Sequence, residues 1–360
     1  MEIGIIGLAK GGKTTVFNAL TTGKAETADY SHTTAPNIGV VKVPDPRLDV
    51  LSAIVRPKRT IPAEVTYVDY AASARGRGVE GQFLAQLSRA DALIHVVRVF
   101  PGEEVPHPDG SIDQERDIGT MNLELVFSDL AIIERRLERL KVGLKGAKPQ
   151  EREAIEREEA LLSRVKSALE DDVPLREQAW PPAEAKLLEN FQFLTAKPLL
   201  LLLNIAECQV PQAAALEEEF AHHRRPGCAV AALCGKLEME LSDLGAEDAR
   251  EFRAALSLDE SALHRVIRVS YGLVGLISFF TIVSEEVKAW TITTGTVVQR
   301  AAGKVHSDME RGFIRAEVIG CEDLAKCGSL AEARGHGLLR REGKNYLVED
   351  GDVMTILFNV

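Results

Sequence analysis

The segment from Gly7 to Thr14, Gly-Leu-Ala-Lys-Gly-Gly-Lys-Thr, constrains the fold of this chain most, because it fits GxxxxGK followed by Ser or Thr. A short apolar run, residues 2–6, precedes it, and residues 14–20 follow with apolar side chains at helical spacing. Strand, glycine loop and helix in this order aim successive backbone N–H groups into one concavity that holds phosphates. The pattern predicts a P-loop α/β domain that binds a nucleotide.

Each position of this loop has an expected role. Lys13 should reach the β- and γ-phosphates and assist catalysis, and the Thr14 hydroxyl should ligate Mg²⁺. Thr15 belongs to the same predicted nucleotide site, at the helix start where the helix dipole favours phosphate. The glycines expected to wrap the phosphates are Gly7, Gly11 and Gly12.

Two further residues are expected beside the magnesium ion. Asp69 ends the β-like run 63–69, which is the usual placement of an aspartate that holds Mg²⁺ through water. Thr33 lies in the segment 30–37, where a switch threonine would cover the metal. Thr14, Thr33 and Asp69 are therefore the predicted metal-site residues.

The residues that recognise the base are expected after the buried run 198–204. The usual guanine pattern is NKxD, in which the aspartate accepts two hydrogen bonds from guanine. Here Asn204 is followed by Ile205 in place of the lysine, and Glu207, one methylene longer, replaces the aspartate. Guanine preference should be weakened, whereas Asn204 suits an adenine edge, so ATP is expected to bind more tightly than GTP. The remaining predicted nucleotide contacts are Cys234 and Gly235.

Length and composition bound the remaining possibilities. A chain of 360 residues is too long for one small core, and its net charge of −11 leaves no general basic field for nucleic acid or lipid. Five cysteines without a CxxC pair indicate reduced thiols, not a disulfide frame or a zinc site. The longest apolar run, 199–203, is far shorter than the ~20 residues of a membrane helix. We expect a soluble, cytoplasmic protein without membrane contact.

The chain is expected to have three parts. Residues 122–195 carry leucines at helical spacing around a turn at 143–149, which predicts a helical hairpin inserted into the P-loop domain of 1–121 and 196–278. Residues 279–360 contain short β-like runs at 289–294, 313–319, 345–348 and 353–358, which predict a small separate domain. The hairpin tip, Arg135 to Arg152, is locally basic and is either a solvated tip or an RNA contact.

Several motifs resemble the YchF/Obg-like ATPase family over essentially the full length of the chain. They are residues 43–49 (Val-Pro-Asp-Pro-Arg-Leu-Asp), 95–98 (His-Val-Val-Arg), 204–207 as the family's NxxE, 302–308, 310–316, 350–354 and 358–360. The resemblance implies a C-terminal TGS domain with a β-grasp fold, a preference for ATP, and slow hydrolysis. It also implies a regulatory switch associated with ribosomes or translation. As a further hypothesis, the helical tip and the TGS domain contact ribosome or RNA.

Departures from the family pattern leave alternatives open. The motif DxxG reads Asp69-Tyr70-Ala71-Ala72 here, Ser73 replaces a bulky apolar residue, and the glycine-rich segment 75–81 is short. These changes favour a binding module with impaired hydrolysis, whereas the intact phosphate loop favours an active ATPase. A GTPase is the third alternative.

Two more residues are candidate catalytic groups. His107 matches the family's loop histidine that orients the attacking water, but a histidine between prolines can also be a simple surface residue. Lys10 stands where the family typically has the asparagine that helps ligate K⁺ beside the phosphates. Its ammonium could replace that ion, or it could simply be solvated.

Overall fold

The computed structural model describes residues 1–21, 23, 36–70, 86–102, 107–108, 110–255, 261–283 and 285–359. These residues form two compact units. The first consists of Met1–Gly39 with Thr66–Val266, and the second of Val40–Val65 with Ile267–Val360. This division differs from the three parts expected from the sequence, because it counts the helical hairpin with the first unit and residues 40–65 with the second.

Six strands in the described part of the chain form the sheet of the first unit: β1 (Glu2–Ile6), β2 (Asn37–Lys42), β4 (Glu64–Asp69), β5 (Ala92–Arg98), β6 (Leu199–Asn204) and β7 (Cys228–Leu233). Their order is β2-β4-β1-β5-β6-β7. The pairs β1–β4, β1–β5, β5–β6 and β6–β7 are parallel. The two strands β5 and β6 are buried along their whole length, as strands covered on both faces should be.

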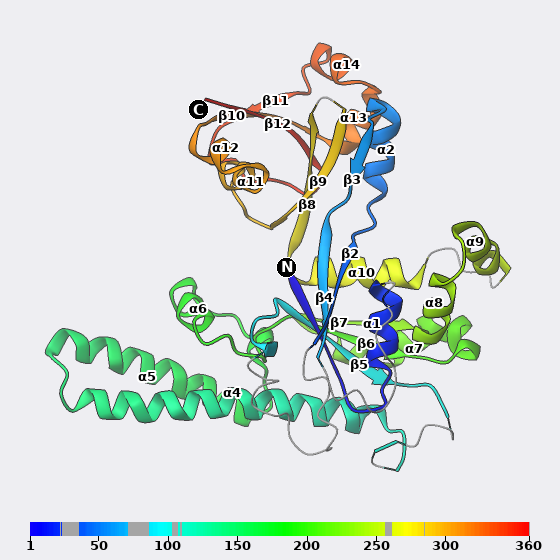
Figure 1. Ribbon diagram of the computed structural model, residues 1–360. Coiled ribbons are helices and arrows are strands. Elements are labelled where there is room, and N and C mark those ends of the chain that lie inside the picture. The colour runs from blue at the N-terminus through cyan, green and yellow to red at the C-terminus, as the bar shows by residue number, and fades with distance from the viewer. Residues whose placement is uncertain are drawn as a thin grey trace. The chain divides into compact units, whose positions relative to one another are not determined.

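Helices of the first unit pack around this sheet and extend from it (Figure 1). They are α1 (Lys13–Thr21), α4 (Gln114–Leu144), α5 (Pro149–Glu170), α6 (Pro182–Glu189), α7 (Ala213–Glu219), α8 (Gly235–Ser242), α9 (Ala246–Ala255) and the start of α10 (Ala262–Leu273). Three 3-10 turns accompany them, η1 (Leu175–Glu177), η2 (Glu207–Gln212) and η3 (Ala221–His223).

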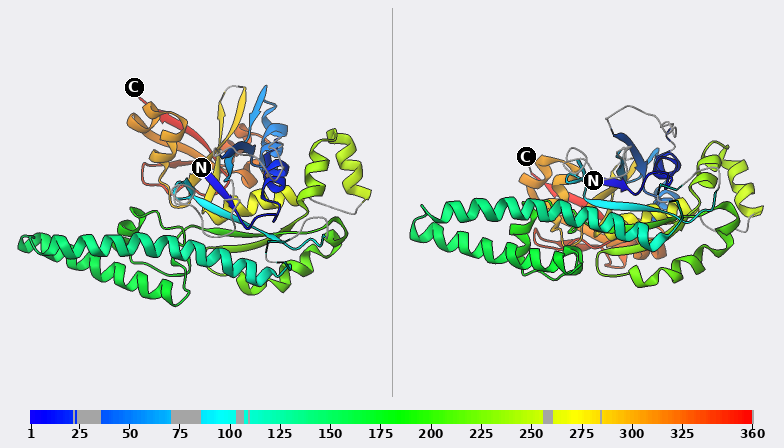
Figure 2. Two further views of the ribbon diagram at one scale, coloured as in Figure 1. Left: turned by 60° about the horizontal axis from the view of Figure 1, so that its bottom comes forward. Right: turned by 90° about the horizontal axis from the view of Figure 1, so that it is seen from below.

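The long helices α4 and α5 lie side by side as the predicted hairpin (Figure 2). The 31 residues of α4 extend for about 47 Å at 1.5 Å per residue. The beginning of α4 packs on the sheet, with Met121 and Leu125 in one core with Val68 and Leu93. Its later residues pack against α5 instead. Because one helix belongs to both cores, the hairpin and the sheet form a single unit.

The second unit is built on a mixed sheet. Its strands in the described residues are β3 (Arg59–Ile61), β8 (Leu276–Val283), β9 (Glu286–Thr293), β10 (Phe313–Gly320), β11 (Arg340–Glu342) and β12 (Asp352–Phe358), in the order β11-β10-β12-β8-β9-β3. Its helices are α2 (Pro46–Val55), α11 (Val298–Val305), α12 (Ser307–Arg311), α13 (Cys321–Cys327) and α14 (Leu330–Gly335). Val298 and Ala301 of α11 share the core with Phe279 of β8 and Met354 of β12. A mixed sheet with a helix packed on it is the arrangement expected of a β-grasp domain.

Residues 40–65 join this second unit through specific contacts. Strand β3 pairs in parallel with β9, with Thr60 opposite Val287. Arg47 Nη1 forms an ion pair with Asp350 Oδ2 at 2.8 Å, and its guanidinium carbon lies 5.2 Å from the centroid of the Phe280 ring. Two of the motifs that carry the family resemblance, 43–49 and 350–354, therefore meet through one arginine. A division based on sequence alone could not include the Arg47–Asp350 ion pair, because the two residues are 303 positions apart.

Other expectations need smaller corrections. The β-like run 345–348 is not a strand, and it contributes a single bridge between Val297 and Leu347. The C-terminal strands of the second unit's sheet begin at Leu276 with β8, slightly before the expected boundary at 279. Among the described helices, none combines the length and the apolar character that a membrane crossing requires.

Candidate functional site

The parallel strands bring the predicted site residues to one edge of the sheet. Gly7 follows β1, Asp69 ends β4, Asn204 ends β6, and Cys234 follows β7. The register agrees, since Ile5 pairs with Asp69. In open α/β sheets ligands bind at the carboxyl ends of the strands. The structure therefore gathers residues from four separate segments at the place where such sheets bind ligands.

The phosphate loop uses glycine where the backbone and its neighbours require it. Gly7 has φ of 146°, and a Cβ there would stand 2.5 Å from the Val96 carbonyl oxygen. Gly12 has φ of 90°, and a Cβ there would stand 2.2 Å from Asn204 Nδ2. At Gly11 the tightest such approach is 3.3 Å, to the Leu8 carbonyl oxygen. The loop is thus closed around two positions that only glycine satisfies.

Lys13 lies at the start of α1 with its ammonium over this loop. Its Nζ donates to the carbonyl oxygens of Gly7 at 3.0 Å and Leu8 at 2.9 Å. Burial lowers the pKa of Lys13 to about 8, and the nearby Asp69 carboxylate partly opposes this shift. The ammonium is therefore held by neutral acceptors at the mouth of the loop, ready for a negatively charged ligand. Thr15, also in the first turn of α1, is half-buried.

The described residues of the predicted magnesium site come from α1 and β4. Thr14 Oγ1 donates to Asp69 Oδ2 at 2.9 Å. Asp69 is only 3% exposed, and in the described part of the chain its other oxygen, Oδ1, is buried without a hydrogen-bond partner. A buried carboxylate oxygen without a donor suits a cation or its bound water, so these residues fit Mg²⁺. The third predicted residue, Thr33, lies outside the described residues.

Asn204 connects the phosphate loop to the next helix. Its Nδ2 donates to the Gly11 carbonyl oxygen at 3.1 Å, and its Oδ1 accepts from the Gly235 backbone N–H at 3.1 Å. The side chain is buried, and its amide spans from the loop to the first residue of α8. In this structure the amide that was expected to face an adenine edge instead fixes the backbone on both sides of it.

The other predicted base contacts differ in exposure. Ile205 is 3% exposed and packs in the core between β6, β7 and α8. Cys234 precedes α8 and is buried, and burial raises the pKa of its thiol. Glu207 begins η2 and is exposed. Of these three side chains only Glu207 is open to a ligand, because the other two belong to the interior.

His107 is not the surface residue that its neighbouring prolines suggested as one alternative. Its side chain is 3% exposed, and its Nε2 lies 2.8 Å from Asp117 Oδ2 at the start of α4. Arg116 Nη2 lies 3.4 Å from the other ring nitrogen, Nδ1. Both nitrogens of the imidazole therefore face side chains of α4.

Arg98 and Phe100 lie close to both this histidine cluster and the phosphate loop. Burial lowers the pKa of Arg98, and the Asp117 carboxylate partly opposes this shift. The Asp117 and Arg98 side chains therefore lie within electrostatic reach of each other. The Arg98 guanidinium carbon lies 4.5 Å from the centroid of the Phe100 ring, and that ring lies 3.8 Å from where a Cβ on Gly12 would stand. Sequence patterns did not single out Asp117 or Phe100, and they included Arg98 only as part of the motif 95–98. The acidic residues in the first turn of α4 are the sequence signal by which Asp117 could have been found.

Lys10 sits in the loop with φ of 62°, in the left-handed region. Residues with a Cβ adopt this conformation at a cost of about 1–2 kcal/mol, which glycine avoids and asparagine partly offsets. The backbone at this position therefore suits the family's asparagine better than a lysine. Ala72, Ser73 and the short segment 75–81 lie outside the described residues.

Comparisons with known proteins agree with this geometry. A family model described as a 50S ribosome-binding GTPase matches residues 2–133, and the C-terminal YchF-GTPase model, described as a protein of unknown function (DUF933), matches residues 276–359. The ribosome-binding ATPase YchF of Bacillus subtilis (strain 168) is 39% identical over 370 residues, covering 100% of both chains. Obg-like ATPase 1 of Pongo abelii is 35% identical over 371 residues, covering 100% of this chain and 92% of the relative.

A solved structure supports the same assignment along the whole chain. The structure of the Schizosaccharomyces pombe YchF GTPase matches with a TM-score of 0.87 at 31% identity, covering 99% of this chain and 97% of that one. This match confirms the predicted P-loop fold with its additional C-terminal domain. The full-length identity to curated relatives confirms the resemblance drawn from the motifs, and the chain belongs to the YchF family of P-loop nucleoside triphosphatases.

Proposed function

We propose that this protein binds ATP with Mg²⁺, hydrolyses it slowly, and acts as a regulatory switch on the ribosome. The observation that carries the proposal is the assembled triad of Lys13, Thr14 and Asp69 at the end of a closed phosphate loop. The curated relatives named ribosome-binding ATPase supply the partner and the nucleotide class. Glu207, in place of the guanine-recognising aspartate, favours ATP over GTP.

Phosphate binding begins with an exchange of acceptors at Lys13. The ammonium leaves the carbonyl oxygens of Gly7 and Leu8 for phosphate oxygens, where the attraction between opposite charges is added to the hydrogen bonds. The loop N–H groups and the start of α1 complete the cradle. Thr14 Oγ1 and Asp69 Oδ1 are the oxygen donors that would hold Mg²⁺, which supplies charge neutralisation on the phosphates when bound.

Water orientation is assigned to His107, with a condition that its contacts impose. In the described state Asp117 and Arg116 face its two ring nitrogens. The imidazole must turn away from Asp117 before a nitrogen can face a water beside the γ-phosphate. Asp117 acts electrostatically on Arg98, and the Phe100 ring beside Arg98 lies near Gly12, so nucleotide in the loop is placed to influence the histidine. This restraint is one physical reason for slow hydrolysis.

Phosphate release from purified protein, with equal concentrations of ATP and GTP in separate samples, tests the enzyme assignment. We expect slow, Mg²⁺-dependent release from ATP and weaker activity with GTP. His107→Ala should leave ATP affinity unchanged and lower the rate at least tenfold, within the usual range of a general acid–base or water-orienting group. His336→Ala, on the exposed surface of the second unit, is the matched control.

The outcomes separate the three alternatives. Tight ATP binding without phosphate release would support the binding module with impaired hydrolysis, for which Ala72 and Ser73 are the sequence argument. A tenfold preference for GTP in binding, about 1.4 kcal/mol, would support a GTPase and contradict the base assignment. Equal rates for His107→Ala and its parent would exclude this histidine from turnover.

Ribosome contact through the hairpin tip has a distinct structural argument. Six basic side chains of the tip are exposed. In the ion pairs of the described residues, Arg136 is the only basic residue of the tip that takes part, and its partner is Glu158. The exposed ones are Arg135, Arg139, Lys141, Lys145, Lys148 and Arg152. A locally basic tip on a chain of net charge −11 concentrates positive potential where phosphate backbones could be met.

Co-sedimentation with ribosomes tests this surface. Charge reversal at Lys141, Lys145 and Lys148 should reduce binding, and binding of the parent should weaken as salt rises because phosphate contacts release counterions. Reversal at three exposed lysines elsewhere, Lys186, Lys236 and Lys344, provides the control for net charge. Undiminished binding by the tip variant would exclude the tip and indicate that the C-terminal domain makes the contact. Lys304 and Arg311 are exposed candidates there.

A further inference from the structure

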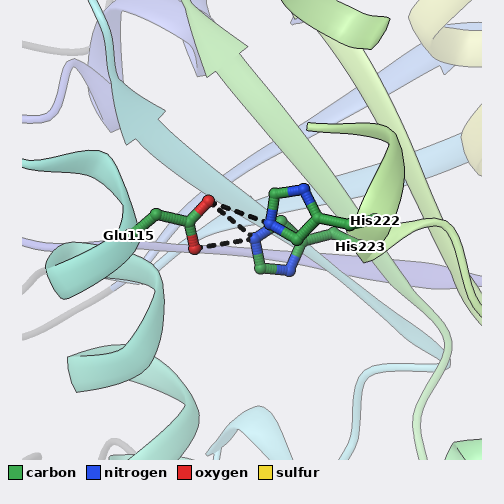
Figure 3. Close-up of side chains that lie close together, drawn as sticks. All are labelled: Glu115, His222 and His223. Carbon is green, nitrogen blue, oxygen red and sulfur yellow. Dashed lines mark hydrogen bonds and ion pairs between the residues drawn. The ribbon is translucent and has the colours of Figure 1, made fainter. Parts of the chain in front are cut away.

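Two adjacent histidines and a glutamate converge on the surface of the first unit, in a cluster that the phosphate site does not use (Figure 3). Glu115 lies in the first turn of α4, and His222 and His223 end η3, in the connection between β6 and β7. His222 Nε2 lies 3.1 Å from Glu115 Oε1, and His223 Nε2 lies 3.0 Å from Glu115 Oε2. The two segments are more than 100 residues apart in sequence, so the fold creates this convergence.

The contacts of His222 define which of its nitrogens faces the cluster. Its Nδ1 lies 3.2 Å from the carbonyl oxygen of Glu219, which can only accept a hydrogen bond. A neutral imidazole therefore carries its proton on Nδ1, and its Nε2 turns an electron pair toward the Glu115 carboxylate. Two acceptors facing each other at this distance repel unless a cation lies between them. Histidines that ligate metals commonly have this second contact, because a backbone carbonyl fixes the ring and its tautomer.

The two imidazole rings of the cluster lie beside each other. The two ring centroids are 4.2 Å apart, and both Nε2 atoms point at the same carboxylate. One divalent ion could bind one ligand atom from each of the three side chains at once.

The dimensions of the cluster fit direct coordination. Its three ligand atoms lie within 4.8 Å of one another. A tetrahedral zinc ion with bonds of about 2.0–2.1 Å has ligand atoms about 3.3–3.4 Å apart, so rotations of exposed side chains suffice to reach that geometry. His222 is 56% exposed and Glu115 is 55% exposed at the side chain, which leaves a direction open for water as a fourth ligand.

The choice of ion follows from the donor atoms. Imidazole nitrogens suit Zn²⁺, Ni²⁺ and Cu²⁺, whereas Mg²⁺ prefers oxygen donors in a nearly octahedral set. The histidines are supported from beneath by Phe220, which is 6% exposed and stacks with both rings at centroid distances of 6.3 Å and 6.2 Å. A buried support limits the motion of η3 and lowers the entropy lost when a ligand is bound.

We propose that Glu115, His222 and His223 form a binding site for a divalent transition-metal ion of the zinc class, separate from the magnesium site of the phosphate loop. The bound ion would fasten the first turn of α4 to the connection between β6 and β7. That turn also carries Asp117, which holds His107, so the metal would stabilise the part of α4 next to the proposed catalytic histidine. The cysteine pattern gave no reason to expect zinc, because the ligands here are histidines.

Calorimetric titration of the untagged, chelator-treated full chain with Zn²⁺ tests the site, and Co²⁺ absorption reports the coordination geometry. We expect one ion per chain, a higher unfolding temperature with Zn²⁺, and visible Co²⁺ bands typical of low coordination number. His222→Ala and His223→Ala should each weaken Zn²⁺ binding at least tenfold, and Glu115→Gln should weaken it as well. Binding of ATP with Mg²⁺, measured on the same samples, shows that each variant is folded.

Two controls and two outcomes make the test decisive. His336→Ala removes an exposed histidine in the second unit, and Cys208→Ser removes an exposed thiol; both should bind Zn²⁺ like the parent. Absence of Zn²⁺ binding by the parent would overturn the proposal and leave a histidine–glutamate cluster without a metal. Unchanged affinity in both histidine variants would also overturn it, because the ion would then be bound elsewhere.

Discussion

The two ends of the nucleotide site use their polar side chains in different ways. At the phosphate end, Lys13 donates to neutral carbonyl oxygens, and one oxygen of Asp69 has no hydrogen-bond partner among the described residues, so both groups have capacity for a ligand. At the base end, Asn204 is bonded at both ends of its amide, and Ile205 lies in the core. The phosphate end is prepared for a ligand, whereas the base end is largely committed to holding the protein together.

This difference explains how affinity and specificity can be separated in one site. In the proposed binding mode the charged groups and the backbone cradle face the phosphates, which ATP and GTP share. Discrimination between the bases then depends on few accessible groups, and among the predicted side chains only Glu207 is exposed. Changes at the phosphate end should therefore alter affinity strongly for both nucleotides, and changes at the base end should alter it less.

The largest effect is expected at the phosphate end. Lys13→Ala should weaken ATP binding at least about 100-fold, a loss of about 2.7 kcal/mol, because the phosphates lose their point charge. GTP should be affected to the same degree. Lys145→Ala, at the exposed hairpin tip, is the control. Titration of fluorescent nucleotide in the presence of Mg²⁺ measures the change, and an unaltered affinity would contradict the phosphate-loop assignment.

Asn204→Ala should weaken ATP and GTP equally, by roughly tenfold. The substitution leaves the Gly11 carbonyl and the Gly235 N–H without their partner, and an unpaired buried backbone group costs about 1–3 kcal/mol. Equal loss is the result expected of a residue that holds the loop. A selective loss of ATP affinity would instead show that Asn204 contacts adenine directly, and the contrast between the two ends would no longer hold.

Nucleotide affinity should also fall above pH 8. The free protein holds Lys13 with a pKa of about 8, because burial disfavours its charge, and phosphate binds the charged form. The charged fraction is nearly complete at pH 7 and falls as pH rises through 8, so affinity should drop about tenfold between pH 7 and pH 9. Lys13→Arg, which stays charged over this range, should flatten the profile. An identical decline in that variant would place the titrating group elsewhere.

A smaller shift is expected at the exposed side of the base end. Glu207→Asp should move the ratio of ATP to GTP affinity toward GTP by about threefold, since it shortens the acid to the length that guanine recognition uses. Adding Ile205→Lys would complete the NKxD pattern in the sequence. Because Ile205 is 3% exposed, that lysine would be buried in the core and would destabilise the protein. Competition titrations of Glu207→Asp alone are therefore the informative measurement, and no change in the ratio would exclude Glu207 from base recognition.

The sequence predicted the parts of the fold that depend on local patterns. Strand β1, the start of α1 and strand β6 are within about one residue of their expected bounds, because apolar spacing and glycine position define them. The helical hairpin was also predicted, but α4 begins at Gln114, before the expected start at 122. Strand β7, Cys228–Leu233, was not predicted, since its alanines give no marked alternation. The pairing of β3 with β9 could not be found, because neither its three exposed or half-buried residues nor its distant partner produces a local signal.

The same distinction applies to the site. Lys13, Thr14 and Asp69 follow from motifs whose spacing carries the chemistry, and the structure brings Thr14 and Asp69 into contact. The amide contacts of Asn204 and the partners of His107 depend on which backbone groups the fold places beside them. A residue type at a motif position indicates a region of the site, but its hydrogen-bond partners follow only from the assembled structure.

The smallest effect is expected at Lys10, which replaces the family's usual asparagine in the phosphate loop. Its φ of 62° is a conformation that asparagine tolerates better than lysine, so the loop retains the backbone shape suited to the family's usual residue. If the Lys10 ammonium neutralises charge between the β- and γ-phosphates, it replaces a K⁺ ion in that role. Hydrolysis by the parent should then be indifferent to the exchange of Na⁺ for K⁺.

Lys10→Asn provides the matching gain. It restores an oxygen that can ligate K⁺ and relieves the left-handed backbone, so we expect hydrolysis to become about threefold faster in K⁺ than in Na⁺, a difference of about 0.65 kcal/mol in the barrier. Lys10→Gln removes the same charge, but glutamine does not share asparagine's tolerance of the left-handed conformation. Hydrolysis by this variant should be slower than by Lys10→Asn in both salts. Phosphate release in matched KCl and NaCl buffers measures all three proteins. Parent activity that rises severalfold in K⁺ would show that the ammonium does not replace the ion, and Lys10 would then be a solvated lysine at the edge of the loop.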